Sequence, residues 1–434
     1  MGKVRLGKKS DLVGRLEDMI PSPENVTNPH VEVTILDGAA ITNMLAPGNA
    51  KTFSDYATHI FLPYITSQLQ HAIRVDVVWD EYRPDSLKAD IRKKRGRGIR
   101  RRVQPFSSIP RNWQAFLRID ENKTELFSYL ATRLVAQETE KQVISTLHKE
   151  VVCTHARDTA DLAPCTHEEA DTRLLLHVKD AVNQGFAKVS IRTVDTDVVV
   201  LAVTAAEQLN MDELWVAFGS GKAFRFIAAH EIAQTLGPDK CRGLPAFHAF
   251  TGCDTVSCFG GRSKKTAWET WKVYDEVTAT FCALSATPNP SIVDDSLNTL
   301  ERFVVLLYDR TSSHEHVNDA RKQLFTQKQR AMDALPPTRE ALRQHIRRTA
   351  YQAGYCWGQM MVPAADLPSP SEWGWVKTDT GWDICWTILP EATNASRQLL
   401  RCGCKKGCRG QCKCRKAILQ CTALCHCSGL CARE

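Results

Sequence analysis

Long hydrophobic runs are missing from this chain of 434 residues. No stretch approaches the roughly 20 apolar residues that a membrane-spanning helix needs, so an integral membrane protein is not expected. The first residues also lack the basic-then-apolar pattern of a signal peptide, so secretion is not expected either. With 43% hydrophobic and 24% charged residues, the composition is that of a globular protein with room for two or three domains.

Cysteine is scarce over most of the chain. Only eight of the 17 cysteines lie in residues 1–401, whereas nine fall between Cys402 and Cys431. Residues 401–434 also hold eight Lys or Arg against one acidic residue, Glu434, and this excess equals the net charge of +7, so the rest of the chain is neutral overall. In a chain that is not secreted, a short, basic, cysteine-rich tail indicates metal binding rather than disulfide bonds.

Strand and helix patterns alternate through the first part of the chain. Apolar runs at 31–41, 74–80, 188–195 and 213–219 are typical of buried strands. Helical patterns lie between them, for example over 168–185, where Gly185 is a stop signal. This alternation predicts an α/β fold in which helices flank a mostly parallel sheet.

The pattern changes after residue 290. Helical periodicity continues to about residue 362, and prolines then mark a linker. The alternation of Trp373 and Trp375 and the turn sequence Asp379-Thr380-Gly381 predict a small Trp-rich hairpin, interpreted as a minor core rather than a surface for stacking bases. We therefore predict a loose leader (1–30), a core (31–290) with a basic, helical region (83–150), a helical extension (291–362), a linker with hairpin (363–395) and a Cys-rich module (396–434).

Acidic residues gather where the predicted strands end. Asp37, Asp80 and Asp195 each close a strand, and the carboxyl ends of parallel strands share one edge of a sheet. Further acids lie nearby in the motifs EEAD, DTD and TGCDT: Glu168, Glu169, Asp171, Asp197 and Asp254. For Glu168, Glu169 and Asp171 the alternative is helix capping and a favourable helix dipole. Converging carboxylates repel one another unless a cation neutralises them, and two divalent ions about 4 Å apart can clamp a phosphodiester.

The order of these motifs resembles the flap endonuclease family of structure-specific 5′-nucleases, which have a PIN-like fold. The matching segments are ILDGAAITNML, VVWDEYRPDSLKADIRKKR, EEADTRLLL, VDTDVVVL and FHAFTGCDTVSCFGGRSKKTA. The resemblance implies that two Mg²⁺ or Mn²⁺ ions are bound by Asp37, Asp80, Glu169, Asp171, Asp195, Asp197 and Asp254. It also implies that Lys88 and Arg95 steady the scissile phosphate, although both could equally be solvated residues of the basic region. The turn with Gly260, Gly261, Lys264 and Lys265 would hold the DNA backbone. Two departures, Asp171 in place of Glu and TGCDT in place of the usual segment, affect the expected substrate geometry.

The tail has nine cysteines with a repeated spacing, which resembles the tesmin-type CXC domain of chromatin and transcription proteins. That resemblance implies three Zn²⁺ ions held by Cys402, Cys404, Cys408, Cys412, Cys414, Cys421, Cys425, Cys427 and Cys431. Three tetrahedral ions need twelve ligand positions, which nine thiolates supply if three of them bridge. Basic residues between the cysteines favour DNA contact: Lys405, Lys406, Arg409, Lys413, Arg415 and Lys416. The alternative is that these charges only balance a negative zinc–thiolate cluster.

Taken together, the motifs predict a Mg²⁺-dependent nuclease that a zinc module targets to DNA in the nucleus, in an arrangement reminiscent of mobile elements. The alternative is a PIN-like scaffold without catalysis in a DNA-binding or chromatin protein. The histidines near the motifs (His167, His177, His230 and His248) receive no role, because a single histidine is more often a structural, hydrogen-bonded residue.

Overall fold

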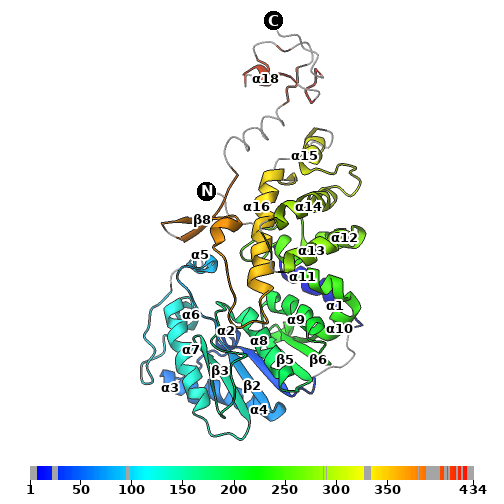
Figure 1. The fold of residues 1–434 in the computed structure, drawn as a ribbon. Helices are drawn as coiled ribbons and strands as arrows, with labels where there is room; N and C mark the ends of the chain where they lie inside the picture. The colour runs from blue at the N-terminus through cyan, green and yellow to red at the C-terminus, as the bar shows by residue number, and fades with distance from the viewer. Residues whose placement is uncertain are drawn as a thin grey trace.

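The protein is described here from a computed structural model. The described ranges are 7–21, 28–93, 98–286, 288–289, 291–326, 334–379 and 381–387, together with 401–404, 408, 411–416, 419–421 and 424–427 of the tail. A central sheet with helices on both faces forms one end of the molecule, and a group of helices extends from it (Figure 1). None of the helices in the described ranges is both long and apolar enough to span a membrane.

The central sheet has seven strands in the described part of the chain, in the order β4-β3-β2-β1-β5-β6-β7. The five inner strands are parallel, whereas β4 and β7 are antiparallel edge strands. The strands are β1 (Val33–Asp37), β2 (Arg74–Val78), β3 (Gln142–Leu147), β4 (Glu150–Cys153), β5 (Lys188–Thr193), β6 (Glu213–Phe218) and β7 (Arg225–Ala228). The predicted α/β class with a mostly parallel sheet is confirmed.

Two apolar cores lie on opposite faces of this sheet, as the alternation along β1 shows. Val33 and Ile35 belong to one core and Leu36 to the other. The helices α2 (Gly38–Met44), α3 (Phe53–Tyr56), η1 (Ala57–Phe61), α4 (Leu62–His71), α6 (Trp113–Leu117) and α7 (Asp120–Val135) cover one face. The other face is covered by α8 (Ala170–Asn183), α9 (Thr196–Gln208) and α10 (Ala229–Leu236). α8 ends at Asn183, and Gly185 follows it with a φ of +87°, so the helix stops where the sequence predicts.

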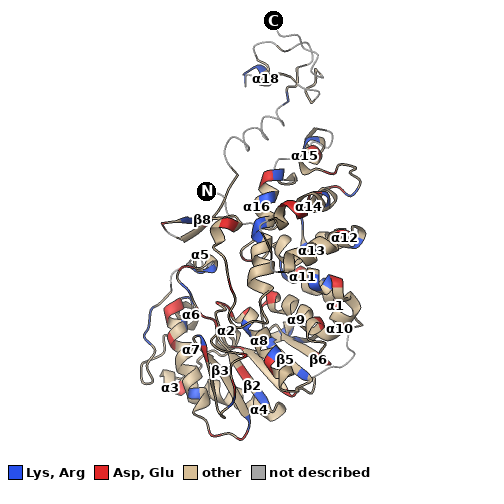
Figure 2. Cartoon of the chain, viewed as in Figure 1, with Lys and Arg blue, Asp and Glu red and all other residues tan. Residues whose placement is uncertain are grey.

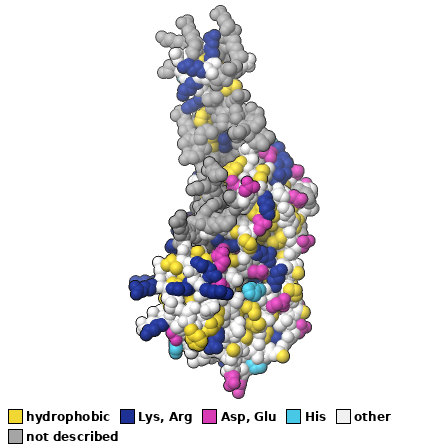
Figure 3. Space-filling model, turned by 90° about the vertical axis from the view of Figure 1, so that its left-hand side faces the viewer, with side chains coloured by type: hydrophobic (Ala, Val, Ile, Leu, Met, Phe, Trp, Pro, Cys, Tyr) yellow, Lys and Arg dark blue, Asp and Glu magenta, His cyan; other side chains and the backbone are white. Residues whose placement is uncertain are grey.

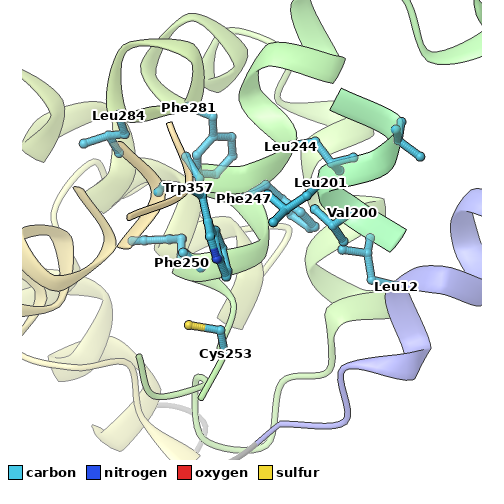
Figure 4. Close-up of a cluster of buried hydrophobic side chains, with 14 of the residues drawn as sticks. Leu12, Val200, Leu201, Leu244, Phe247, Phe250, Cys253, Phe281, Leu284 and Trp357 are labelled. Atoms are coloured by element: carbon cyan, nitrogen blue, oxygen red, sulfur yellow. The ribbon is translucent and has the colours of Figure 1, made fainter. Parts of the chain in front are cut away.

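The helices after the sheet share the core of α9, against which α11 packs directly. They are α11 (Pro238–Phe250), α12 (Lys264–Val273), α13 (Val277–Ser285), α14 (Ile292–Tyr308), α15 (Val317–Thr326), α16 (Arg339–Ala350) and the π-helical turn η4 (Tyr351–Trp357). Phe247 of α11 is central: its ring lies 4.6 Å from that of Trp271 and 5.7 Å from that of Phe281, measured between centroids. Figure 4 shows Phe247 beside Val200 and Leu201 of α9, with Phe281 on the other side of Phe247. The region after residue 290 is therefore helical, as predicted, and continuous with the core.

The predicted Trp-rich hairpin is confirmed as an antiparallel pair, β8 (Trp375–Thr378) and β9 (Gly381–Ile384). Trp373 is not a strand residue, however, because it ends the 3-10 turn η5 (Pro370–Trp373). Trp373 and Trp375 are both buried, with their rings against Tyr355 and Tyr351 respectively. The hairpin thus packs as a small core, in line with its interpretation from the sequence.

One prediction about local structure was wrong. The first residues are not a loose leader, because α1 (Ser10–Glu17) buries Leu12, Val13 and Leu16. The region 83–150, predicted to be basic and helical, holds the helices α5 (Leu87–Lys93), α6 and α7, but it ends in β3 and the first residue of β4. The alternation in QVISTL is weak, and only its pairing with β2 makes it a strand.

Candidate active site

The acidic residues lie at the carboxyl edge of the sheet, at the point where the strand order reverses. β1 is flanked by β2 on one side and β5 on the other, so chain connections leave it in both directions. Asp37 is the last residue of β1, Asp195 follows β5 by two residues, and Asp80 follows β2 by two residues. Ligands of open α/β sheets bind at such a reversal point.

A cavity of about 260 Å³ opens at this edge. Six of the seven acids implied by the resemblance line it: Asp37, Asp80, Glu169, Asp171, Asp195 and Asp254. The seventh, Asp197, does not line the cavity but lies close to two acids that do. One carboxylate oxygen from each of Asp171, Asp195 and Asp197 lies within 4.8 Å of the other two. Segments separated by more than 200 residues are therefore brought together, as predicted.

Backbone capping fixes several of these carboxylates. Asp37 caps α2, with Oδ1 accepting a 2.9 Å hydrogen bond from the amide of Ala40. Asp195 caps α9 by accepting from the amide of Asp197 at 2.8 Å. Asp80 accepts from the amide of Ala170, also at 2.8 Å. Capping thus occupies one oxygen of each carboxylate, while the other oxygen of Asp37 accepts from the hydroxyl of Thr193 at 2.9 Å and that of Asp80 from the hydroxyl of Tyr82 at 2.8 Å. For Glu169, one of the acids for which capping was the alternative, the structure shows no side-chain capping bond.

Burial and mutual repulsion disturb the ionisation of three acids. Burial, followed by the charge of Asp80, raises the pKa of Asp37 to about 7. Burial and the neighbouring Asp197 raise the pKa of Asp195 to about 6. Burial and Asp195 likewise raise the pKa of Asp171 well above its usual value. The positive groups nearby do not offset the burial and repulsion of these three carboxylates. Hard oxygen donors in this arrangement fit a divalent cation such as Mg²⁺ or Mn²⁺.

Asp197 differs from the other acids because positive or donating groups occupy both of its oxygens. His248 Nε2 lies 2.8 Å from Oδ1, and Lys9 Nζ lies 2.8 Å from Oδ2. Burial opposes ionisation of Asp197, but His248, Lys9 and Lys88 together lower its pKa below the usual value. Lys9 Nζ also lies 2.6 Å from Oδ1 of Asp254.

Basic side chains form the opposite wall of the cavity. Lys88, on α5, forms an ion pair with Glu169 and lies 3.8 Å from Asp171. Burial opposes its charge, but Asp171 and the other acids keep the pKa of Lys88 above its usual value. Arg92 bonds to Glu168 and Asp120 beside it. The other predicted phosphate ligand, Arg95, lies outside the described residues.

Lys9 and His248, which contact Asp197, were missed by sequence reasoning. Lys9 was assigned to the leader, and nothing in its sequence context distinguishes it from Lys8. His248 stands six residues before Asp254 in the motif FHAFTGCDT, and this proximity was the only signal available. Both contacts depend on helix packing, which brings α1 and α11 against α9.

The predicted DNA-backbone turn is only partly exposed. Gly261, with φ of +66°, and Lys265 lie at the surface. Lys264 is buried, with 2% of its surface exposed, and Nζ donates to the carbonyl oxygen of His248 at 2.6 Å and to Oγ1 of Thr251 at 2.8 Å. Burial lowers the pKa of Lys264 to about 7. The prediction that its side chain contacts DNA is therefore wrong in this structure, because that side chain holds the loop before Asp254.

A second cavity, of about 300 Å³, adjoins the acidic one through Lys88, Glu168 and Glu169. Its other walls come from η4 and from residues 365–370 after it, and they include Tyr351, Trp357 and Pro368. The linker therefore closes one side of the site, a role that the sequence did not indicate.

The cysteines of the tail face one another. Several Sγ atoms in the described part of the tail lie 3.4 to 3.7 Å apart, for example 3.4 Å between Cys402 and Cys408 and 3.5 Å between Cys414 and Cys425. Four thiolates around zinc, with Zn–S of about 2.3 Å, would be about 3.8 Å apart, whereas a disulfide is about 2.05 Å long.

Two groups of four cysteines meet the geometry of a metal site: Cys402, Cys408, Cys412 and Cys421 form one, and Cys402, Cys414, Cys421 and Cys425 form the other. Cys402 and Cys421 belong to both groups, as bridging ligands would. Lys413, Arg415 and Lys416 are exposed on the short helix α18 (Lys413–Lys416). Cys431, Lys405, Lys406 and Arg409 lie outside the described residues.

Neither a family model nor a curated protein matches the chain. Among solved structures, the chain is similar to a product complex of a bacteriophage T5 flap endonuclease variant with DNA and metal ions, at 11% identity and a TM-score of 0.36, covering 74% of this chain and 100% of that one. It is also similar to the T5 5′-exonuclease with bound zinc, at 12% identity and a TM-score of 0.36, covering 74% and 99% of the two chains. At this level of similarity, functional inference depends on the residues of the site.

Proposed function

We propose that the protein is a divalent-metal-dependent nuclease that hydrolyses phosphodiester bonds of DNA at the acidic cavity. The observation that carries this proposal is the convergence of acids from five separate segments at the reversal point of the sheet. Asp37, Asp171 and Asp195 all have raised pKa values there. A scaffold without catalysis gains nothing from buried carboxylates that destabilise one another.

The side chains divide the work of the proposed reaction. Asp37, Asp80, Asp171 and Asp195 would hold Mg²⁺ or Mn²⁺, which when bound activates a water molecule and neutralises phosphate oxygens. Lys88 would exchange its ion pair with Glu169 for a non-bridging oxygen of the scissile phosphate. The two-ion mechanism predicted from the sequence would place positive charge at two positions. The ammonium group of Lys9, which lies between Asp197 and Asp254, supplies a further positive charge beside these acids.

Exposed arginines between α5 and α7 offer a surface for a nucleic-acid backbone. They lie on the loop between α5 and α6 and directly after α6: Arg100, Arg101, Arg102, Arg111 and Arg118. Figure 2 shows Lys and Arg along this loop. In the space-filling view, basic side chains gather on the face that lies to the left in Figure 1 (Figure 3). Such a surface would guide the backbone toward the acids.

For the tail we propose a structural cluster of three Zn²⁺ ions that binds DNA through its basic residues. The two four-cysteine groups with shared members support bridged zinc. The exposed charges of α18 support contact with phosphates. A DNA substrate and a DNA-binding tail together favour a nuclear protein, and the pairing of the two modules favours descent from a mobile element.

The test is cleavage of 5′-flap, hairpin and single-stranded DNA, and of the same structures in RNA, with Mg²⁺ or Mn²⁺. We expect wild-type protein to cleave DNA, and Asp195→Asn and the double variant Asp195→Ala/Asp197→Ala to lose at least 100-fold in rate. Asp212→Asn, which changes an exposed acid at the far end of the sheet, is the matched control and should cleave normally.

Equal cleavage by wild type and the site variants would trace the activity to a contaminant and disprove the enzyme. No cleavage under any condition, together with intact DNA binding, would establish the alternative of a DNA-binding scaffold. Cleavage restricted to RNA would support the proposed nuclease activity and show that the substrate is RNA rather than DNA.

A further inference from the structure

Lys9 is held firmly in the acidic site by the helix that follows it. α1 buries Leu12, Val13 and Leu16, and Figure 4 shows Leu12 beside Val200 of α9. At the other end of the helix, both carboxylate oxygens of Glu17 bond to Arg225, at 2.5 and 2.7 Å. These contacts fix the position from which Lys9 extends.

The chain before α1 is equally constrained. Gly7 passes so close to the loop that carries Asp254 that a Cβ at this position would lie 3.1 Å from Cβ of Cys258. Lys9 thus lies between the packed helix α1 and the segment at Gly7, which runs close to Cys258. Its side chain is only 19% exposed.

The Lys9 ammonium group occupies the place where a cation between Asp197 and Asp254 would stand. Its Nζ atom lies 2.8 Å from Asp197 and 2.6 Å from Asp254, on carboxylates of two different segments. His248 bonds to the other oxygen of Asp197, so both oxygens of this carboxylate already have a partner within the protein. Four other aspartates line the cavity: Asp37, Asp80, Asp171 and Asp195.

We propose that Lys9 replaces the second divalent ion, so that this protein binds one Mg²⁺ or Mn²⁺ at the acids of β1, β2, α8 and β5 and uses the Lys9 ammonium as a fixed cation between Asp197 and Asp254. The inference rests on the proposed nuclease function and changes its cofactor requirement. A lysine supplies one positive charge without the cost of capturing an ion, but it cannot be removed by a chelator. Lys9 then acts as a positioning residue for Asp197 and Asp254.

The test counts bound Mn²⁺ in the full zinc-loaded chain by electron paramagnetic resonance. We expect one Mn²⁺ per wild-type chain with an uncoupled spectrum. Lys9→Met keeps the length of the side chain and removes its charge, and it should bind a second Mn²⁺ at least tenfold more tightly than wild type does, with the spin coupling of two neighbouring ions. Lys9→Arg should keep one ion. The matched control is Lys8→Met, which removes the neighbouring lysine, 77% exposed, and should behave as wild type.

Adding Asp254→Asn to Lys9→Met should abolish the second ion, since it removes a ligand from the vacated position. Thermal unfolding without metal shows whether each variant is folded before ions are counted. Two coupled ions in wild type would show that a divalent ion can displace the Lys9 ammonium group. An unchanged ion count in Lys9→Met would show that the position between Asp197 and Asp254 cannot bind an ion. Either result overturns the inference. Expected ion counts without any cleavage would overturn the nuclease but not the role of Lys9, whereas no Mn²⁺ binding in any variant would overturn both.

Discussion

His248 and Asp197 are joined by a 2.8 Å contact between Nε2 and Oδ1, with side chains that are 0% and 1% exposed. The other ring nitrogen, Nδ1, is buried and has no hydrogen-bond partner among the described residues. Burial, followed by the charge of Lys264, lowers the pKa of His248 to about 4. The imidazole is therefore neutral at pH 7, with its hydrogen on Nε2, and donates to the carboxylate.

Removing this donor should destabilise the protein. We expect His248→Leu to lower the free energy of unfolding by about 1–3 kcal/mol, because the buried carboxylate of Asp197 loses a hydrogen bond. His248→Gln places an amide nitrogen near the position of Nε2 and should recover most of the loss. Urea unfolding measures both, and equal losses in the two variants would show that ring packing against Trp357, not the hydrogen bond, dominates.

Asp195→Asn should raise stability in the absence of metal and abolish the response to metal. Asparagine caps a helix about as well as aspartate, while the repulsion with Asp197 and Asp171 disappears. Wild type should gain thermal stability when Mg²⁺ or Mn²⁺ is added, since a ligand of the folded state stabilises it. Calorimetry with EDTA and with added metal gives both results; a variant that keeps the metal-induced shift would place the ion elsewhere.

His345 should make the protein sensitive to mild acid. It is buried against Phe250 and Phe259, and burial, followed by Arg348, lowers its pKa to about 3. The unfolded state, with a histidine pKa near 6.5, binds the proton first as pH falls, so stability should decline from about pH 6.5 downward. His345→Gln should reduce the loss between pH 7 and pH 5 by about 2 kcal/mol. Urea unfolding at several pH values measures it, with the exposed His155→Gln as control; equal pH slopes would contradict the buried neutral state.

Lys264 and Lys265 should have opposite roles although they are neighbours. Lys264→Met leaves the His248 carbonyl and Thr251 without their buried donor, and we expect a loss of about 1–3 kcal/mol in unfolding free energy. Lys265→Ala should leave stability unchanged and lower the salt dependence of DNA binding by about one phosphate contact. Unfolding and fluorescence anisotropy at several salt concentrations separate the two, and a reversed outcome would restore Lys264 as the DNA ligand.

The shared cysteines of the tail should matter more than the others for zinc content. Cys421 belongs to both four-cysteine groups and Cys412 to one. Cys421→Ala should therefore lose about two zinc ions and Cys412→Ala about one, from a total near three. Atomic absorption on the purified chains gives the counts, and equal losses would indicate separate sites without bridging thiolates.

The sequence by itself determined the α/β alternation and the hairpin and predicted which acids lie together, because strand and helix periodicity and short motifs are local properties. It identified Asp37, Asp80 and Asp195 at strand ends, and spacing alone singled out the cysteine cluster. The tertiary structure decided what surrounds these groups. Lys9 and His248 resemble an ordinary surface residue and a single histidine in the sequence, and only the packing of α1 and α11 brings them to Asp197 and Asp254. The packing of α12 likewise turns Lys264 to the carbonyl oxygen of His248. Such long-range contacts follow from side-chain packing between helices, which no local pattern encodes.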